Sequence, residues 1–196
     1  NKIELLKNML RTMIIEKHRI LIFCDDIWSM NYVHSQLKFE FMIIGVINMS
    51  TSIQNREDYV EKFLCEDDTF AKILILSRTG DEGIDVPSAS KLIQICTPWG
   101  SRRQHAQRIG RVQRPSSDKN ICCEAITLVS EGTSEIEFAQ RRDEYLKEMG
   151  YDVHHSFCDL NKSFKEESLI KLIKERKVSK KKDSKTRLKR HSVATP

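Results

Sequence analysis

The sequence lacks the glycine-rich loop GxxxxGKS or GxxxxGKT that cradles nucleotide phosphates, and no strand ends in paired acids beside such a loop. The chain alone is therefore not expected to bind nucleotide through a P-loop. It also lacks a signal-peptide pattern and any apolar run near the ~20 residues of a membrane span, so we expect no membrane partner. None of the six cysteines forms a CxxC pair, which favours buried reduced thiols over zinc sites or disulfides and indicates an intracellular protein.

What the sequence does contain is an arginine-dense segment at residues 100–114, GSRRQHAQRIGRVQR. Arg108, Arg111 and Arg114 recur every third residue, so in a helix their guanidinium groups line one face. Guanidinium forks bind phosphate oxygens in a bidentate manner. The arginines here have no acidic partners at helical spacing, which favours a phosphate partner over a solvated basic face. Gly110 costs a helix about 1 kcal/mol relative to Ala and indicates a close backbone approach.

Short apolar runs alternate with helical patterns, and this alternation predicts an α/β domain with a mainly parallel sheet flanked by helices. The expected strands are Arg19–Cys24, Met42–Ile47, Lys72–Ser77, Lys91–Cys96 and Cys122–Val129. The expected helices are Lys2–Ile15, Ile27–Phe39, Ile53–Leu64, Gly100–Arg114 and Ser134–Met149, with Thr51-Ser52 capping the third of them. Such sheets bind ligands at the carboxyl ends of their strands, where Asp25 and Ser77 fall.

The net charge of +5 is unevenly distributed. Residues Lys174–His191 hold ten Lys or Arg and two acids, a charge of +8, which leaves −3 for the rest of the chain. Nucleic-acid contact by the body is therefore expected to be local. We expect a folded domain over residues 1–160 and a basic, disordered tail over residues 161–196. Because the chain begins inside a helical pattern without an initiator Met, we expect it to belong to a longer protein.

Three segments have the order and spacing that resemble the second RecA-like lobe of superfamily-two helicases and translocases. Ile20–Asp26 resembles motif IV, Ser77–Pro87 resembles motif V, and Gln107–Arg114 resembles motif VI. More narrowly, the chain is similar to the XPB family, the DNA translocase subunit of transcription and repair factor TFIIH. The segments that carry this similarity are GSRRQHAQRIGRVQR, Thr51-Ser52 with Arg56, KLIQIC and Thr133–Tyr151. The resemblance covers about residues 2–153 and implies a single RecA-like lobe.

The resemblance implies an active site shared with a first RecA-like lobe, absent from this chain, that binds ATP and Mg²⁺. Arg111 and Arg114 resemble the arginine fingers that reach this ATP, and Arg108 resembles the helix arginine that supports them. The positions that match the family's nucleotide-binding pattern are Gln104, Gln107, Arg108, Gly83 and Asp85. For Asp85, shaping a turn is the alternative role.

Contacts with the DNA backbone are implied for a second group, Ser77, Arg78, Thr51, Ser52 and Arg56. Ser77 stands where the superfamily has a hydroxyl on the backbone, and a strand-end cap is its alternative role. The hydroxyl-rich helix start at Thr51 and Ser52 suits a DNA phosphate, although a plain helix start has the same residues. Arg78 departs from the XPB pattern, which has Lys at this position.

The implied function is the C-terminal motor lobe of an ATP-dependent double-stranded DNA translocase or helicase, acting in transcription initiation and nucleotide excision repair in the nucleus. The implied partners are double-stranded DNA, the first RecA-like lobe in cis, and other TFIIH-type subunits or a repair nuclease. One alternative is the second lobe of another superfamily-two motor, either an RNA helicase or a chromatin remodeller. Another is a non-catalytic nucleic-acid-binding module that has lost the motor. A P-loop and a DExD or DExH motif upstream would identify a motor.

Two further expectations follow from this resemblance. The chain alone is expected to lack ATPase activity, because the P-loop lysine and the metal-binding acid belong to the first lobe. The basic tail from Lys174 to Arg190 is expected to add salt-sensitive affinity for DNA or another acidic partner, or to direct nuclear import. A solvated tail that only keeps the chain soluble is the alternative.

Overall fold

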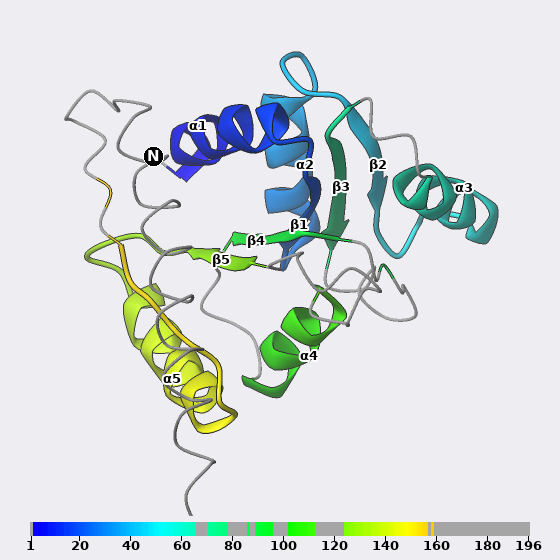
Figure 1. Ribbon diagram of the computed structural model, residues 1–196. Coiled ribbons are helices and arrows are strands. Elements are labelled where there is room, and N and C mark those ends of the chain that lie inside the picture. The colour runs from blue at the N-terminus through cyan, green and yellow to red at the C-terminus, as the bar shows by residue number, and fades with distance from the viewer. Residues whose placement is uncertain are drawn as a thin grey trace, which may run out of the picture. The chain divides into compact units, whose positions relative to one another are not determined.

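A computed structural model of the chain describes residues 2–65, 70–77, 86, 89–95, 102–112, 124–156 and 158, with the backbone alone at 102–104, 111 and 112. The described helices and strands all lie in one unit, Asn1–Phe157 (Figure 1). The expected tail, residues 161–196, lies outside the described residues. Among the described helices, none has both the length and the apolar character needed to cross a membrane.

The strands form one five-stranded parallel sheet in the order β2-β3-β1-β4-β5. They are β1 (Arg19–Cys24), β2 (Ile43–Ile47), β3 (Lys72–Ser77), β4 (Lys91–Ile95) and β5 (Glu124–Leu128). The helices are α1 (Lys2–Ile15), α2 (Ile27–Leu37), α3 (Ile53–Leu64), α4 (Arg102–Val112) and α5 (Glu135–Glu148). The predicted α/β fold with a mainly parallel sheet is confirmed, and the predicted bounds that fall on described residues differ from the observed ones by at most two residues. The predicted bounds at Cys96, Gly100, Arg114 and Cys122 lie outside the described residues.

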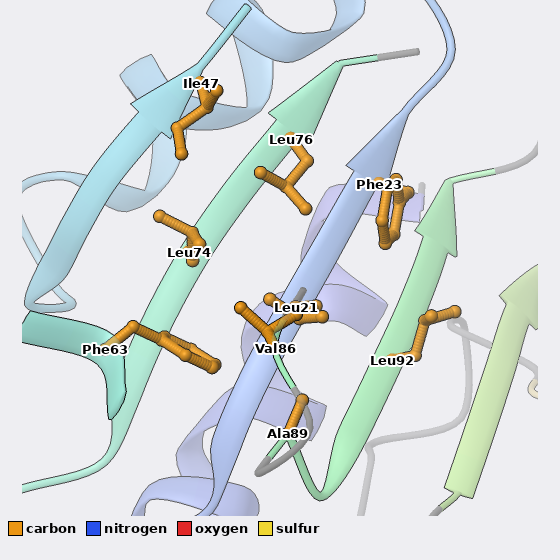
Figure 2. Packing of buried hydrophobic residues seen from close by; sticks show 9 residues of the cluster. All are labelled: Leu21, Phe23, Ile47, Phe63, Leu74, Leu76, Val86, Ala89 and Leu92. Carbon is orange, nitrogen blue, oxygen red and sulfur yellow. The ribbon is translucent and has the colours of Figure 1, made fainter. Parts of the chain in front are cut away.

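The central strand β1 is apolar along almost its whole length because helices cover both faces of the sheet. On one face Leu21 and Phe23 join a buried cluster with Phe63 of α3, and Figure 2 shows these side chains standing on the same side of the strands. Helix α2 packs against β1 and β3, behind the sheet in that view, and α1 lies beside it. The sheet is therefore the middle layer of three.

Helix α2 ends at Leu37, two residues before the predicted end at Phe39. The backbone N–H groups of Glu40 and Phe41 both donate to the carbonyl oxygen of Leu37, and this turn leads the chain into β2. Phe39 is exposed and has no core to pack against. The helical pattern of the sequence therefore extends two residues past the observed end of the helix.

The parallel arrangement brings the carboxyl ends of four strands to one edge of the sheet. Cys24 at the end of β1 pairs in register with Ser77 of β3 and with Ile95 of β4, and Ile47 of β2 pairs with Leu76 of β3. Asp25 and the turn before α3, which follow two of these strands, therefore start along the same edge. This is the edge at which parallel α/β sheets bind their ligands.

Strand β2 approaches Tyr59 of α3 closely at Gly45. A Cβ atom at Gly45 would lie 2.5 Å from Cδ2 of the Tyr59 ring. We expect Gly45→Ala to lower the free energy of unfolding of the chain by about 1–3 kcal/mol, the usual penalty of overpacking, since the ring has to move. Chemical denaturation followed by circular dichroism measures the difference.

Gly110→Ala is the matched control for this prediction. Gly110 lies exposed on α4, and apart from its chain neighbours and the backbone of its own helix, no described heavy atom lies within 4 Å of a Cβ atom at this position. The close backbone approach that the sequence indicated is therefore made by no described residue. The control is expected to raise the free energy of unfolding by up to about 1 kcal/mol through helix propensity. Stabilisation by both substitutions would contradict the close contact at Gly45.

Candidate functional site

Helix α4 lies against β4, β5 and α5, and it buries one face. Among the side chains of α4 that the structure describes, His105, Ala106, Arg108 and Ile109 are buried, whereas Gln107 is exposed. Buried positions at i, i+1, i+3 and i+4 are those of an amphipathic helix. Since two of the four buried side chains are polar, α4 is held by directional hydrogen bonds as well as by apolar contacts.

Arg108 is the first of these polar contacts. Its side chain is 2% exposed, and its Nη1 donates to Oδ1 of Asp25 at 2.8 Å. The guanidinium carbon lies 4.9 Å from the ring centroid of Phe23, within the range of a cation–π contact. Asp25 directly follows β1, and Phe23 is on that strand. The sequence offered Arg108 no acidic partner at helical spacing because its partner lies 83 residues away along the chain.

His105 makes the second polar contact, one turn earlier on α4. Its Nδ1 lies 2.6 Å from Oε1 of Gln94, a buried residue of β4. Burial, followed by the positive charges of Arg142 and Arg108, lowers the pKa of His105 to about 4. The ring is therefore neutral at pH 7. Because an amide oxygen can only accept, Nδ1 carries the proton and donates it to Gln94.

Two small side chains lie at the ends of the central strands. Burial, with the nearby carboxylates of Asp26 and Asp25, raises the pKa of the Cys24 thiol to about 12, so this thiol is not a nucleophile at neutral pH. Ser77 lies beside it in register and is 2% exposed. Such burial favours the strand-end role for Ser77, and its contact with DNA stays a prediction.

Thr51, Ser52 and Arg56 together build the turn between β2 and α3. The Arg56 guanidinium donates through Nε to the carbonyl oxygen of Thr51 at 3.0 Å and through Nη2 to that of Asn48 at 2.9 Å. Oγ1 of Thr51 accepts the backbone N–H of Asn48 at 3.0 Å. The Ser52 side chain caps α3, which confirms the predicted helix start. Their contact with a DNA phosphate stays a prediction.

The structure describes only some of the other predicted site residues. Gln107 is exposed on α4, and Gln104 and Arg111 lie on the same helix with only their backbone described. The residues that lie outside the described part of the chain are Arg78, Gly83, Asp85 and Arg114. The structure thus brings Arg108 and Arg111 onto one anchored helix, and it places Ser77 and the turn before α3 at the same edge of the sheet.

Sequence reasoning missed the partners of the buried polar residues. It placed Asp25 at a strand end without assigning it a role, and it assigned none to Gln94 or His105. Two features of the sequence pointed to these contacts. Gln94 is a polar residue between two isoleucines of a short apolar strand, and Asp25 directly follows another apolar strand. A buried polar group requires a partner, so each of these positions indicated a contact from another element.

Comparison with known proteins identifies several relatives. The family model described as ERCC3/RAD25/XPB C-terminal helicase matches residues 1–192. The TFIIH basal transcription factor complex helicase/translocase XPB subunit of Trypanosoma brucei brucei is 39% identical over 135 residues, which are 68% of this chain and 14% of that protein. The general transcription and DNA repair factor IIH helicase/translocase subunit XPB/SSL2 of Saccharomyces cerevisiae is 33% identical over 135 residues, 68% of this chain and 15% of that protein. The chain therefore spans less than a sixth of the length of either relative.

Solved structures show the same fold at lower identity. The C-terminal domain of the DEAD-box protein Dbp5 superposes with a TM-score of 0.60 at 21% identity, covering 75% of this chain and 79% of that one. Dbp5 L327V of S. cerevisiae, solved with RNA and ADP BeF3, gives a TM-score of 0.67 at 17% identity, covering 89% of this chain and 41% of that one. The α/β sheet is thus that of a RecA-like helicase lobe.

Proposed function

The chain belongs to the ERCC3/RAD25/XPB C-terminal helicase family, and we propose that it is the second motor lobe of an ATP-dependent translocase on double-stranded DNA. The observation that supports this most directly is the anchoring of α4, which carries the motif VI sequence, to the carboxyl edge of the sheet. Membership of a TFIIH-type complex, with nuclear action in transcription initiation and excision repair, is supported by the names of the relatives.

In this proposal Arg111 and Arg114 donate to the phosphate oxygens of ATP held by a first lobe in cis. Negative charge on these oxygens is redistributed in the transition state, and donors that are already oriented stabilise it without reorganisation. The anchoring of α4 provides such orientation. Arg108, which donates to Asp25, supports the helix and leaves phosphate contact to the other two arginines.

The remaining nucleotide contacts are assigned by the same proposal to Gln104, Gln107, Gly83 and Asp85. Gln107 is exposed and so is accessible to a ligand. Among the described residues no three His, Cys, Asp or Glu side chains are grouped as metal ligands. We place Mg²⁺ on the first lobe, where it would neutralise negative charge on the nucleotide phosphates.

Double-stranded DNA is proposed as the track, with Ser77, Arg78 and the turn of Thr51, Ser52 and Arg56 along its backbone. The relatives at 39% and 33% identity are named as TFIIH subunits, and one name includes DNA repair. The likeness to Dbp5 solved with RNA, at 17% identity, is a likeness of fold. These observations favour a DNA translocase over an RNA helicase.

The isolated 196-residue chain is expected to hydrolyse no ATP, whereas the two-lobe protein that contains it hydrolyses ATP in response to double-stranded DNA. The reason is that the chain has no P-loop to hold the phosphates. Phosphate release from both proteins measures this, with the Arg111→Ala chain as the control for contamination. Turnover by the isolated chain that Arg111→Ala abolishes would overturn the shared active site. Stimulation of the two-lobe protein by RNA and not by DNA would support the RNA helicase alternative.

A further inference from the structure

The structure assigns to Asp25 a role that the proposed function leaves open: we infer that Asp25 is a positioning residue for ATP hydrolysis, acting through Arg108 to fix the register of α4 on the sheet. The inference rests on the proposed function, in which Arg111 of the same helix meets the phosphates of ATP. It concerns how accurately that helix is held, and it assigns Asp25 no contact with ATP.

Two residues on successive turns of α4, among those whose side chains the structure describes, make polar bonds at the sheet. His105 bonds to Gln94 within β4, and Arg108 bonds to Asp25 at the end of β1. Apolar contacts such as that of Ile109 have no preferred direction, so they tolerate small sliding movements. A hydrogen bond weakens steeply with distance and angle. Two bonds three residues apart, one to β4 and one to the residue that follows β1, therefore fix both the rotation of α4 and its position along its axis.

The bond to Asp25 is the one nearer to the proposed catalytic arginine. Arg111 follows Arg108 by three residues, which is about 4.5 Å along a helix axis. The backbone between them is a continuous α-helix, so a displacement at Arg108 is transmitted to the backbone at Arg111. Reactions that depend on alignment are sensitive to such displacements, and a misplacement of about 1 Å can lower a rate by about 100-fold.

The charge of Asp25 matters because Arg108 is buried. A guanidinium group that is 2% exposed, with its carbon over the Phe23 ring, requires a nearby carboxylate to compensate its charge. Without that carboxylate the side chain has to move toward solvent or toward another acceptor. Since Arg108 is part of α4, either movement shifts the helix.

The neighbouring carboxylate of Asp26 provides a matched control. Its Oδ1 accepts the backbone N–H of Ser29 and its Oδ2 accepts the Ser29 hydroxyl, both at 2.7 Å, so it caps α2. Asn is as good a helix cap as Asp. Asp25→Asn and Asp26→Asn therefore make the same chemical change at adjacent positions, and only the first changes the contact with Arg108.

The test uses the two-lobe protein in a DNA-stimulated ATPase assay. Asp25→Asn is expected to lower kcat by about 10- to 100-fold, with KM for ATP and DNA affinity unchanged within error. Asp26→Asn is expected to keep the wild-type kcat. In an Arg108→Met background, Asp25→Asn is expected to have no further effect, because the two residues act as one unit. If the reduction in kcat of the double variant equals the product of the two single reductions, Asp25 acts independently of Arg108, and that would overturn the inference.

Loss of stability alone is tested with Leu146→Ala, which removes an apolar contact of α5 from the cluster containing Ala106 and Ile109 of α4. Assayed below its melting temperature, this variant is expected to keep its kcat. An equal fall in kcat would reduce Asp25 to a general stabilising role and overturn the inference.

If Asp25→Asn fails to fold, Asp25→Glu keeps the charge and displaces the carboxylate by one methylene. A wild-type kcat for that variant would also overturn it.

Arg111→Ala in the same assay separates the inference from the proposed function. If Arg111→Ala keeps wild-type turnover, the proposed active site is wrong. If Arg111→Ala loses turnover and Asp25→Asn does not, the active site stands and the positioning role of Asp25 is wrong.

Discussion

Arg111→Ala in the two-lobe protein is expected to lower kcat for DNA-stimulated ATP hydrolysis by about 10³- to 10⁵-fold, the contribution of an arginine finger. That factor corresponds to about 4–7 kcal/mol of transition-state stabilisation. The effect falls on kcat because the guanidinium group meets charge that is greater in the transition state than in the ground state. Arg114→Ala is expected to behave in the same way. Phosphate release and DNA binding, measured on the same preparations, separate turnover from affinity.

Substitution by lysine tests the geometry of the guanidinium group. Arg111→Lys and Arg114→Lys are expected to restore little activity, because one ammonium group cannot replace a planar fork with several donors. Arg141→Ala is a suitable control, since Arg141 is an exposed arginine of α5 outside motif VI. If both alanine variants kept near wild-type hydrolysis, the assignment of motif VI would be wrong.

The elements of the sheet could be predicted because their sequences depend on burial on both faces. RILIFC and KILILS have no alternation of polar and apolar residues, and short runs of this kind favour central parallel strands. The start of α3 was predictable for an equally local reason, since Ser52 caps the helix with its own side chain. Each of these features is determined by a few neighbouring residues.

The contacts of α4 could not be predicted in this way. A pattern of charge along one helix predicts that every arginine is exposed. Arg108 is instead buried, and it pairs with a carboxylate 83 residues away along the chain. The pairing depends on strand order, because Asp25 and α4 meet only after β1 and β4 have become neighbours in the sheet. His105 is similar, since the histidine lies on α4 and its partner Gln94 on β4. Tertiary pairs of this kind require the topology first.

Arg108→Ala is expected to lower the free energy of unfolding of the 196-residue chain by about 3–5 kcal/mol, the usual loss when one partner of a buried ion pair is removed. Both side chains are largely shielded, with Arg108 2% and Asp25 9% exposed. Solvent therefore compensates little of the charge left on Asp25. The loss is a large part of the 5–15 kcal/mol that is typical of folded domains. Urea denaturation measures it, and the exposed pair of Arg11 and Glu40 provides a control, since Arg11→Ala is expected to cost at most about 1 kcal/mol.

The double variant Asp25→Leu with Arg108→Met distinguishes the charge from the packing. If the loss in Arg108→Ala comes mainly from an uncompensated buried carboxylate, removing both charges while keeping their volume restores most of the stability. If it comes mainly from the cavity that the missing side chain leaves beside Phe23, the single variant Arg108→Met is itself close to wild type. We expect the first result, because the 2.8 Å bond joins a guanidinium and a carboxylate that are both largely shielded from solvent. A double variant as unstable as Arg108→Ala would contradict it.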